Sequence, residues 1–442
     1  MPSLSRPSRL VLMCCIVVLL IGLGPAPAAG QRDLDPDEIA MLHVYLATPY
    51  RLELDNQAVL ETLQALPGVT KVEGQTIFPA WWQPASAEDF ERVAVTAYAG
   101  VMSDTQLERP RLLAGRFSQA GMNEIMLDQR LADRYDFEIG DTVVFRSLTT
   151  DLAVEEWIIT AIVEQPYPTF SPAINPTLLG AGSVYATADD ARYLTGSDEL
   201  TAIFARYESF GVAEARQADF LATIATETPY VPLLSYLADP DEPNPLPARG
   251  ALDDALDLRT EVVPQVMFVA PTGVDADAMR FLLQNEVDGI VAASPGFVYG
   301  AGLDVQYIGF DPATNTLDFE LVEGEAWFSD PERAGVVTSQ ELASTQNKRV
   351  GDTITIRVGG SEVEYEIIGI HSGTGQTVYM PWIDLAMLAG FIEENDTPLP
   401  NRLFFTLDGD PDAAAVDAII ADMDAVLAEN YIRGFFVNLA EE

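Results

Sequence analysis

Few side chains in this sequence have both the type and the spacing that catalysis requires. Only two histidines occur, His43 and His371, and they stand at non-equivalent places of a repeated sequence, so we expect structural or exposed roles rather than a base or a metal ligand. The sequence has no Gly-x-Ser-x-Gly elbow and no His-Glu-x-x-His motif. No spacing singles out a catalytic pair among the 68 acidic residues. We therefore predict no enzymatic activity, no cofactor and no metal; a hydrolase that uses carboxylates is kept as a third hypothesis.

The sequence repeats itself at an offset of 211 residues. Gly140-Asp141-Thr142 aligns with Gly351-Asp352-Thr353, and Leu131-Ala132 aligns with Leu342-Ala343, with no gap between the two motifs. The match extends in both directions with small insertions and deletions. Self-similarity over this length indicates two copies of one domain. In each copy we expect the Gly-Asp pair to form a turn, because glycine adopts a positive φ and the Asp side chain caps the turn.

Hydrophobic periodicity predicts β-α-β at the start of each copy and β-α-(β) at its end, with a strand-rich insert between them. In the first copy we expect helices at 56–66, 128–135 and 212–226, and strands at 39–46, 69–77, 93–98, 124–127, 142–145, 157–163 and 203–207. In the second copy we expect strands at 262–269, 303–308, 317–321, 353–358, 363–370 and 402–406, before a last helix capped by Asp410. Two β-α-β halves in one antiparallel sheet are ferredoxin-like. The predicted fold class is α+β, with two homologous modules.

The N-terminus has the pattern of a targeting segment. Arg6 and Arg9 precede an apolar run that ends in Pro-Ala-Pro-Ala-Ala, so residues 1–28 are predicted to be a signal peptide or an N-terminal membrane anchor. Cys14 and Cys15 both lie inside this run, so no disulfide is expected outside it. We place the first module at 36–228, a Pro/Asp-rich linker at 229–260 and the second module at 261–438. The expected location is extracytoplasmic, either anchored to the cell membrane or secreted.

The charge balance is strongly acidic. The 24 basic residues face 68 acidic ones, which gives a formal net charge of −44. Such a surface repels phosphate backbones, so we expect no nucleic-acid partner. The charge indicates either solubility or a surface for counter-ions and cationic ligands.

Two segments are candidate partner contacts. The first is an aromatic segment that contains Trp81 and Trp82, because exposed aromatic residues are typical of interfaces; the alternative is an aromatic core. The second is the loop at 165–182, which the second copy lacks and which contains Tyr167 and Phe170. Loops of this kind often carry binding residues.

The ordered motifs resemble the periplasmic core domain of MacB/FtsX-like ABC-transporter permeases. In the first copy the motifs are Leu66-Pro67-Gly68-Val69, Leu113-Ala114-Gly115-Arg116-Phe117, Glu124-Ile125-Met126-Leu127 and Ile139-Gly140-Asp141-Thr142-Val143. The second copy keeps the order with Leu321-Val322-Glu323-Gly324, Val336-Val337-Thr338-Ser339 and Val350-Gly351-Asp352-Thr353-Ile354. The resemblance departs from the family in two respects. Such permeases usually carry three or more further membrane spans, and no second span is recognised here. Where they have two such domains, membrane spans usually separate them, whereas a proline-rich linker is predicted here.

The resemblance implies a domain that works outside the membrane, where family members couple ATP-driven motion to lipoproteins, peptides, drugs or cell-wall hydrolases. Nucleotide hydrolysis then belongs to a separate cytoplasmic protein or domain. The predicted function is a non-catalytic extracytoplasmic component of an ABC-transporter permease system. Its expected partners are the ATPase and permease subunits of the transporter, with an envelope protein, a peptide or a lipoprotein as further candidates. The alternative is a secreted binding or structural protein that is independent of a transporter.

Overall fold

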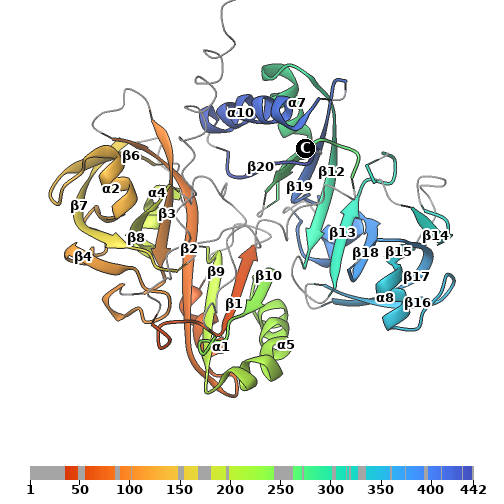
Figure 1. The fold of residues 1–442 in the computed structure, drawn as a ribbon, viewed down its shortest axis with the longest axis horizontal. Coiled ribbons are helices and arrows are strands. Elements are labelled where there is room, and N and C mark those ends of the chain that lie inside the picture. The colour runs from red at the N-terminus through yellow and green to blue at the C-terminus, as the bar shows by residue number, and fades with distance from the viewer. Residues whose placement is uncertain are drawn as a thin grey trace, which may run out of the picture.

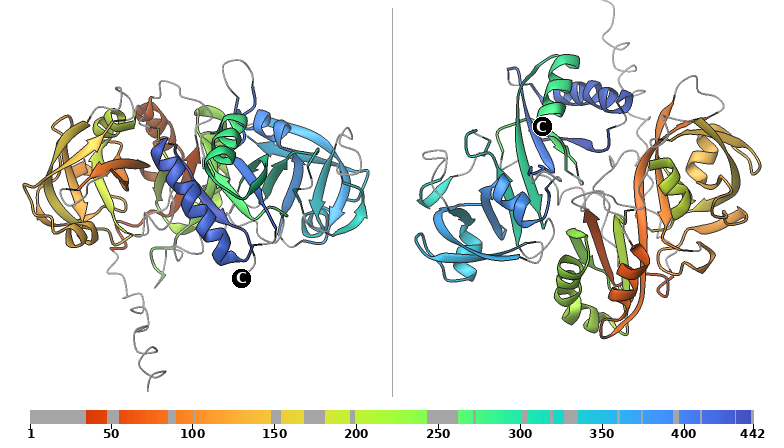
Figure 2. Two further views of the ribbon diagram at one scale, coloured as in Figure 1. Left: turned by 90° about the horizontal axis from the view of Figure 1, so that it is seen from above. Right: turned by 180° about the vertical axis from the view of Figure 1, so that it is seen from behind.

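The computed structural model describes residues 35–47, 55–84, 90–100, 102–147, 154–167, 181–195, 199–242, 262–270, 273–300, 305–314, 316–317, 320–326, 335–358, 361–373, 375–392, 397–409, 411–430 and 432–440. The segment predicted as a signal or anchor lies outside these residues. Within them, no helix combines the length and the apolar character that crossing a membrane would need. Two modules are seen side by side, and each is built on one ten-stranded sheet (Figures 1 and 2).

The first module contains ten strands, four α-helices and one short 3₁₀ helix in the described residues. The strands are β1 (Leu42–Ala47), β2 (Val69–Gln83), β3 (Glu91–Tyr98), β4 (Arg111–Gly115), β5 (Glu124–Asp128), β6 (Thr142–Arg146), β7 (Val154–Glu164), β8 (Ser183–Thr187), β9 (Ala202–Tyr207) and β10 (Val231–Leu237). The helices are α1 (Asn56–Gln64), η1 (Met102–Asp104), α2 (Gln129–Tyr135), α4 (Ala188–Thr195) and α5 (Phe210–Glu227).

The second module has a matching set of elements. Its strands are β11 (Val266–Val269), β12 (Ile290–Tyr299), β13 (Gln306–Phe310), β14 (Leu321–Gly324), β15 (Val336–Ser339), β16 (Thr353–Val358), β17 (Ser361–His371), β18 (Thr377–Pro381), β19 (Arg402–Leu407) and β20 (Phe435–Asn438). Its helices are α7 (Ala276–Glu286), α8 (Gln340–Thr345), α9 (Trp382–Leu388) and α10 (Ala413–Glu429).

Both sheets have the same strand order. The first runs β10-β1-β9-β2-β3-β8-β5-β7-β4, with β6 beside β7 and β2, and the second runs β20-β11-β19-β12-β13-β18-β15-β17-β14, with β16 beside β17. The first four strands of each sheet, with the helices α1 and α5 or α7 and α10, form the ferredoxin-like arrangement that the sequence predicts. The remaining strands belong to the insert, which extends the same sheet. The α+β fold class is therefore confirmed.

The predicted Gly-Asp turns are confirmed in both modules. Gly140 has a φ of 99° and Gly351 a φ of 88°, values that favour glycine. The Asp141 side chain accepts a hydrogen bond from the Glu138 backbone N–H at 2.8 Å, and the Asp352 side chain accepts one from the backbone three residues earlier at the same distance. Each turn thus starts the strand, β6 or β16, that pairs with β7 or β17.

The predicted linker at 229–260 begins too early. Residues 231–237 form β10, which pairs antiparallel with β1 from Leu42 to Ala47. Pro232 is tolerated because β10 is the edge strand of its sheet, where a missing N–H donor disrupts no second neighbour. Residues 243–260 of the predicted linker lie outside the described part of the chain. The last helix also starts later than predicted: Asp412, not Asp410, caps α10, and its side chain accepts from the Ala415 N–H at 2.9 Å.

The two modules share an apolar core. One cluster of buried side chains joins Tyr45 and Phe204 of the first module to Met267 and Phe404 of the second. Beyond this cluster, Arg92 in β3 and Asp424 in α10 form an ion pair at 3.3 Å. Burial of apolar side chains stabilises such a contact by roughly 25 cal/mol per Å². The two modules are therefore packed against each other and are not only tethered by a linker.

Candidate functional site

The predicted aromatic patch is buried. Trp81 is 2% exposed and Trp82 is 1% exposed, because β2 lies inside the sheet and is covered on both faces. The Trp82 ring packs edge-on against Tyr135, with 5.3 Å between ring centroids, and it also contacts Phe145. These tryptophans therefore form the aromatic core that was the alternative interpretation, and they are not available as a partner contact.

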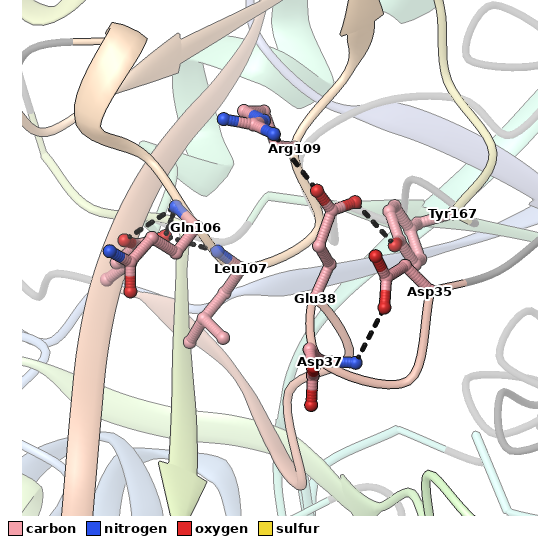
Figure 3. Close-up of polar contacts among 8 residues, drawn as sticks. Asp35, Asp37, Glu38, Gln106, Leu107, Arg109 and Tyr167 are labelled. Atoms are coloured by element: carbon pink, nitrogen blue, oxygen red, sulfur yellow. Dashed lines mark hydrogen bonds and ion pairs between the residues drawn. The ribbon is translucent and has the colours of Figure 1, made fainter.

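The loop candidates have separate outcomes. Tyr167 is 3% exposed, and its hydroxyl donates a hydrogen bond to Glu38 at 3.0 Å, whereas Phe170 lies outside the described residues. Glu38 also accepts from Arg109 at 3.0 Å, so one carboxylate joins the N-terminal segment, the segment after β7 and the loop before β4 (Figure 3). Burial raises the pKa of the Tyr167 phenol. Tyr167 thus fixes a junction between three segments and does not project as a contact.

His43 belongs to the same junction. Its side chain is fully buried in β1, its ring stacks on Tyr236 with 4.3 Å between centroids, and its Nε2 contacts the Glu108 carboxylate. Glu108 is also buried, and its backbone N–H donates to the Glu38 carbonyl at 2.8 Å. A buried imidazole paired with a buried carboxylate holds the loop before β4 against the strand. Neither group reaches solvent, so a substrate cannot approach this pair.

His371 is buried at the end of β17. Its Nδ1 accepts the Gly373 N–H at 3.0 Å, and its Nε2 lies 3.1 Å from the Thr377 hydroxyl. Burial lowers the pKa of His371 to about 4, which keeps the ring neutral at pH 7. The ring therefore organises the turn between β17 and β18. This placement fits the structural role that the sequence indicated for both histidines.

Glu73 holds the loop after η1. Its carboxylate accepts the Gln106 N–H at 2.9 Å and the Leu107 N–H at 2.8 Å. Lys71, two residues earlier on the same strand, lies 3.2 Å from the Glu73 carboxylate. This ion pair brings one of the two lysines of the sequence to the edge of a pocket.

The pocket has a volume of about 250 Å³ and lies between α1, the start of β2 and the segment after β3. Its wall contains both polar and apolar groups, and it is lined by Gln57, Leu60, Glu61, Gln64, Lys71, Val72, Glu73, Gly74, Tyr98, Ala99, Gly100, Asp104 and Thr105. The Tyr98 hydroxyl is buried, and it has no hydrogen-bond partner among the described residues. The pocket therefore presents an ammonium group, carboxylates and carboxamides, which can bind a polar group by hydrogen bonds and charge.

Sequence reasoning missed this pocket. Its residues come from three segments, 57–64, 71–74 and 98–105, which are joined by the packing of α1 against β2 and by the pairing of β2 with β3. One signal was present, because Lys71 is one of two lysines in the chain and stands two residues before Glu73 on a predicted strand. In the described part of the chain, no group of three His, Cys, Asp or Glu side chains is placed to hold a metal ion.

The comparisons with known proteins centre on one family. The model of the MacB-like periplasmic core domain matches residues 247–423. No curated protein matches the chain significantly.

Three solved structures are similar to the chain. The extracellular domain of the noncanonic ABC-type transporter YknZ from Gram-positive bacteria is 12% identical, with 39% of this chain and 87% of that chain covered and a TM-score of 0.27. The periplasmic region of MacB from Actinobacillus actinomycetemcomitans is 10% identical, with coverages of 42% and 94% and a TM-score of 0.28. A domain of a putative permease protein from Porphyromonas gingivalis is 15% identical, with the same coverages and a TM-score of 0.26.

The family match falls on the second module, whose motifs were among those that carried the resemblance. The matched range begins before β11 and ends inside α10, so it takes in almost all of that module. Residues 247–423 of this chain are therefore a MacB-like periplasmic core domain.

Proposed function

We propose that the chain is a non-catalytic, extracytoplasmic component of an ABC-transporter permease system and that it binds a partner or substrate outside the membrane. The observation that carries the proposal is the MacB-like periplasmic core domain at 247–423. The first module repeats the strand order of the second, which supports a tandem of the same domain. The transporter's ATPase and permease subunits are the proposed partners.

The absence of catalysis in this proposal is supported by the placement of the two histidines. His43 and His371 are both buried and both have structural contacts. A general base must reach the proton that it removes, and neither ring is open to a substrate.

The pocket beside α1 is the proposed contact for the partner. Trp81 and Trp82 are buried in the core and cannot be this contact. The pocket, in contrast, offers polar groups from three segments of the chain. Lys71 is 34% exposed there, so its ammonium group can meet a carboxylate of the partner. Acidic residues surround Lys71 in the pocket and favour a partner that also carries positive charge. A mixed-charge surface of an envelope protein would fit both requirements.

Co-purification from native membranes tests the function. The full chain with an affinity tag is expressed at native level, cells are cross-linked, and membranes are solubilised in mild detergent. We expect an ABC-transporter ATPase or permease to be enriched at least ten-fold over an untagged control. Recovery of the chain alone, mainly from the medium, would contradict the proposal and favour the secreted binding or structural protein.

The two lysines give a matched test of the pocket. Lys71→Glu and Lys348→Glu change the net charge equally, but only Lys71 lines the pocket. We expect Lys71→Glu to lower transporter recovery at least five-fold while Lys348→Glu leaves it unchanged. Equal losses would show that the pocket is not the contact, although the co-purification itself would still support the function.

A further inference from the structure

β4 and β14 end the two sheets on opposite sides of the molecule (Figure 1). Among the described strands, β4 pairs only with β7 and β14 pairs only with β17. All five residues of β4 are exposed, as are three of the four residues of β14. Each strand therefore turns one row of backbone N–H and C=O groups away from its sheet, which is the feature that allows another strand to add to an edge.

The same β-bulge occurs on both edges. The register between β4 and β7 shifts between Leu112 and Ala114, so Leu113 has no opposite residue. The register between β14 and β17 shifts in the same way around Val322. Leu113 is 45% exposed and Val322 is 54% exposed. A bulge redirects a side chain, and here it directs an apolar side chain into solvent at equivalent positions of the two modules.

A glycine after each bulge keeps the edge close to its neighbour. A Cβ on Gly115 would lie 2.2 Å from the Thr160 carbonyl oxygen, and a Cβ on Gly324 would lie 2.2 Å from the Ile368 carbonyl oxygen. The φ angles of these glycines are 86° and 81°. Both edges therefore have the same backbone shape, which two strands need if they are to extend each other's sheets in a regular way.

The charges at the two edges are opposite. Arg111 and Arg116 flank the apolar part of β4, and Glu320 and Glu325 occupy the equivalent places at β14. In an antiparallel pair of these strands, Arg111 would lie opposite Glu325 and Arg116 opposite Glu320. Opposite charges at facing positions stabilise a strand pair, and like charges destabilise it. Two copies of β4 or two copies of β14 would instead place like charges together at one or both ends.

The arginines are accessible although they have partners within the chain. Arg111 is 44% exposed and lies 3.2 Å from Glu164, and Arg116 is 54% exposed in its ion pair with Glu124. A guanidinium has five N–H donors, so each arginine can bind a second carboxylate. The chain has a net charge of −44, and an edge with two arginines is therefore a place where a second copy meets less repulsion.

We propose that the chain self-associates head to tail, with β4 of one copy pairing antiparallel with β14 of another. The two edges are different surfaces at opposite ends of one molecule, so the contact is heterologous and leaves one edge of each kind open. Repetition of the contact gives open chains, or rings where the rotation closes. The paired area is limited to two short strands, which places the contact among the weak, small interfaces. This assembly goes beyond partner binding and does not depend on it.

Sedimentation velocity of the full chain in detergent, from micromolar to high micromolar concentration, tests the proposal. Wild type is expected to form a concentration-dependent series beyond the dimer. Leu113→Asp blocks the β4 edge and Val322→Asp blocks the β14 edge, and each variant alone is expected to associate at least ten-fold more weakly. An equimolar mixture is expected to form a one-to-one dimer and nothing larger, because each variant keeps one intact edge.

A control and a charge test complete the design. Met387→Asp alters a similarly exposed apolar residue on α9, 57% exposed, and should leave association unchanged. Arg111→Glu and Glu325→Arg should each weaken association about five-fold, and their combination in one chain should restore it. A strictly monomeric wild type, association that survives both edge variants, or dimers of Val322→Asp alone would each overturn the proposal.

Discussion

The two modules have the same topology but treat equivalent positions of the sheet differently. Position 202 begins β9 and position 402 begins β19; the first holds Ala202, fully buried, and the second holds Arg402, 2% exposed. The residues just before these positions make equivalent hydrogen bonds. The Thr201 hydroxyl accepts the Ile77 N–H and the Asn401 side-chain oxygen accepts the Val298 N–H, both at 2.8 Å. The hydrogen bonds that fix strand register are thus common to both modules, whereas the side chains that fill the interior differ.

A second difference lies in the inserts. In the first module, Trp82, Phe145 and Trp157 pack together. In the second module, Ile356 and Tyr365 occupy the places of Phe145 and Trp157 in the strand pair β16–β17. A shared backbone pattern therefore accepts Phe and Trp at these two positions in one copy and Ile and Tyr in the other. Volume and hydrophobic pattern decide whether such a core folds, more than the identity of each side chain.

The strongest test of this comparison is Trp82→Ala in the aromatic core. Removal of a buried large aromatic side chain should lower the free energy of unfolding by about 3–5 kcal/mol. Urea denaturation followed by circular dichroism measures the loss, and Trp82→Phe, which keeps a ring, should lose less. If Trp82→Ala changed partner recovery but not stability, the buried placement of this residue would be contradicted.

The second largest effect is expected at His371. Its equivalent in the first module is Val163, so only the second module has a titratable side chain at this position. The His371 pKa is lowered to about 4 by burial, while an unfolded histidine titrates near 6.5. The unfolded state therefore binds more protons between these values, and stability falls as pH falls from about 6.5 to 4, by roughly 2–3 kcal/mol in total. Above pH 6.5 this contribution is constant.

The measurement is the pH slope of unfolding free energy for His371→Val against wild type. The variant should show a smaller loss between pH 7 and pH 4. Its stability at pH 7 is not the readout, because the Gly373 N–H also loses its acceptor. A second variant, His371→Asn, keeps an acceptor near the Gly373 N–H and should show the same reduced slope. Unchanged slopes in both variants would refute the buried neutral histidine.

Arg402 is the third test, and it concerns a buried position where one module has a charged side chain and the other has an alanine. Its guanidinium donates to the Asn401 carbonyl at 2.8 Å, it has no ion pair among the described residues, and burial lowers its pKa. A buried charge without a carboxylate partner is unfavourable. Arg402→Met should therefore raise the free energy of unfolding by about 1–3 kcal/mol.

The matched change is Ala202→Arg, which should destabilise the first module because it introduces a charge at a buried position. Thermal unfolding of both variants provides the comparison. A loss of stability in Arg402→Met would contradict the prediction, because it would mean that the buried guanidinium stabilises the second module.

Local patterns were the part of the fold that the sequence predicted best. The Gly-Asp turns need only glycine at positive φ and a short acidic side chain, and both are visible in the sequence. β10 was missed because Pro232 and the prolines that follow resemble a linker, while its strand conformation depends on pairing with β1. The repeat supplied the long-range information, since two similar sequences must fold in the same way.

The candidate site was less predictable for a physical reason. From the sequence, Trp81 and Trp82 fit either an exposed patch or a buried core. Which of the two forms depends on the elements that cover each face of β2. Residues 74–82 are buried at every position, which is typical of a strand that is covered on both faces. Neither the covering elements nor the pocket beside Lys71 can be recognised from one segment, because both depend on contacts between distant parts of the chain.

The smallest expected effect compares the last long helix of each half. Asp412 caps α10 with a hydrogen bond from Ala415 N–H, whereas Ser209 precedes α5 without a side-chain cap. Asp412→Ala should lower the free energy of unfolding by about 1 kcal/mol, and Ser209→Ala by a few tenths. Chemical denaturation of the two variants under identical conditions measures the difference. Equal losses would show that the two helices are held by their packing against β9 and β10 or β19 and β20 alone, so that the capping difference between the modules has no energetic consequence.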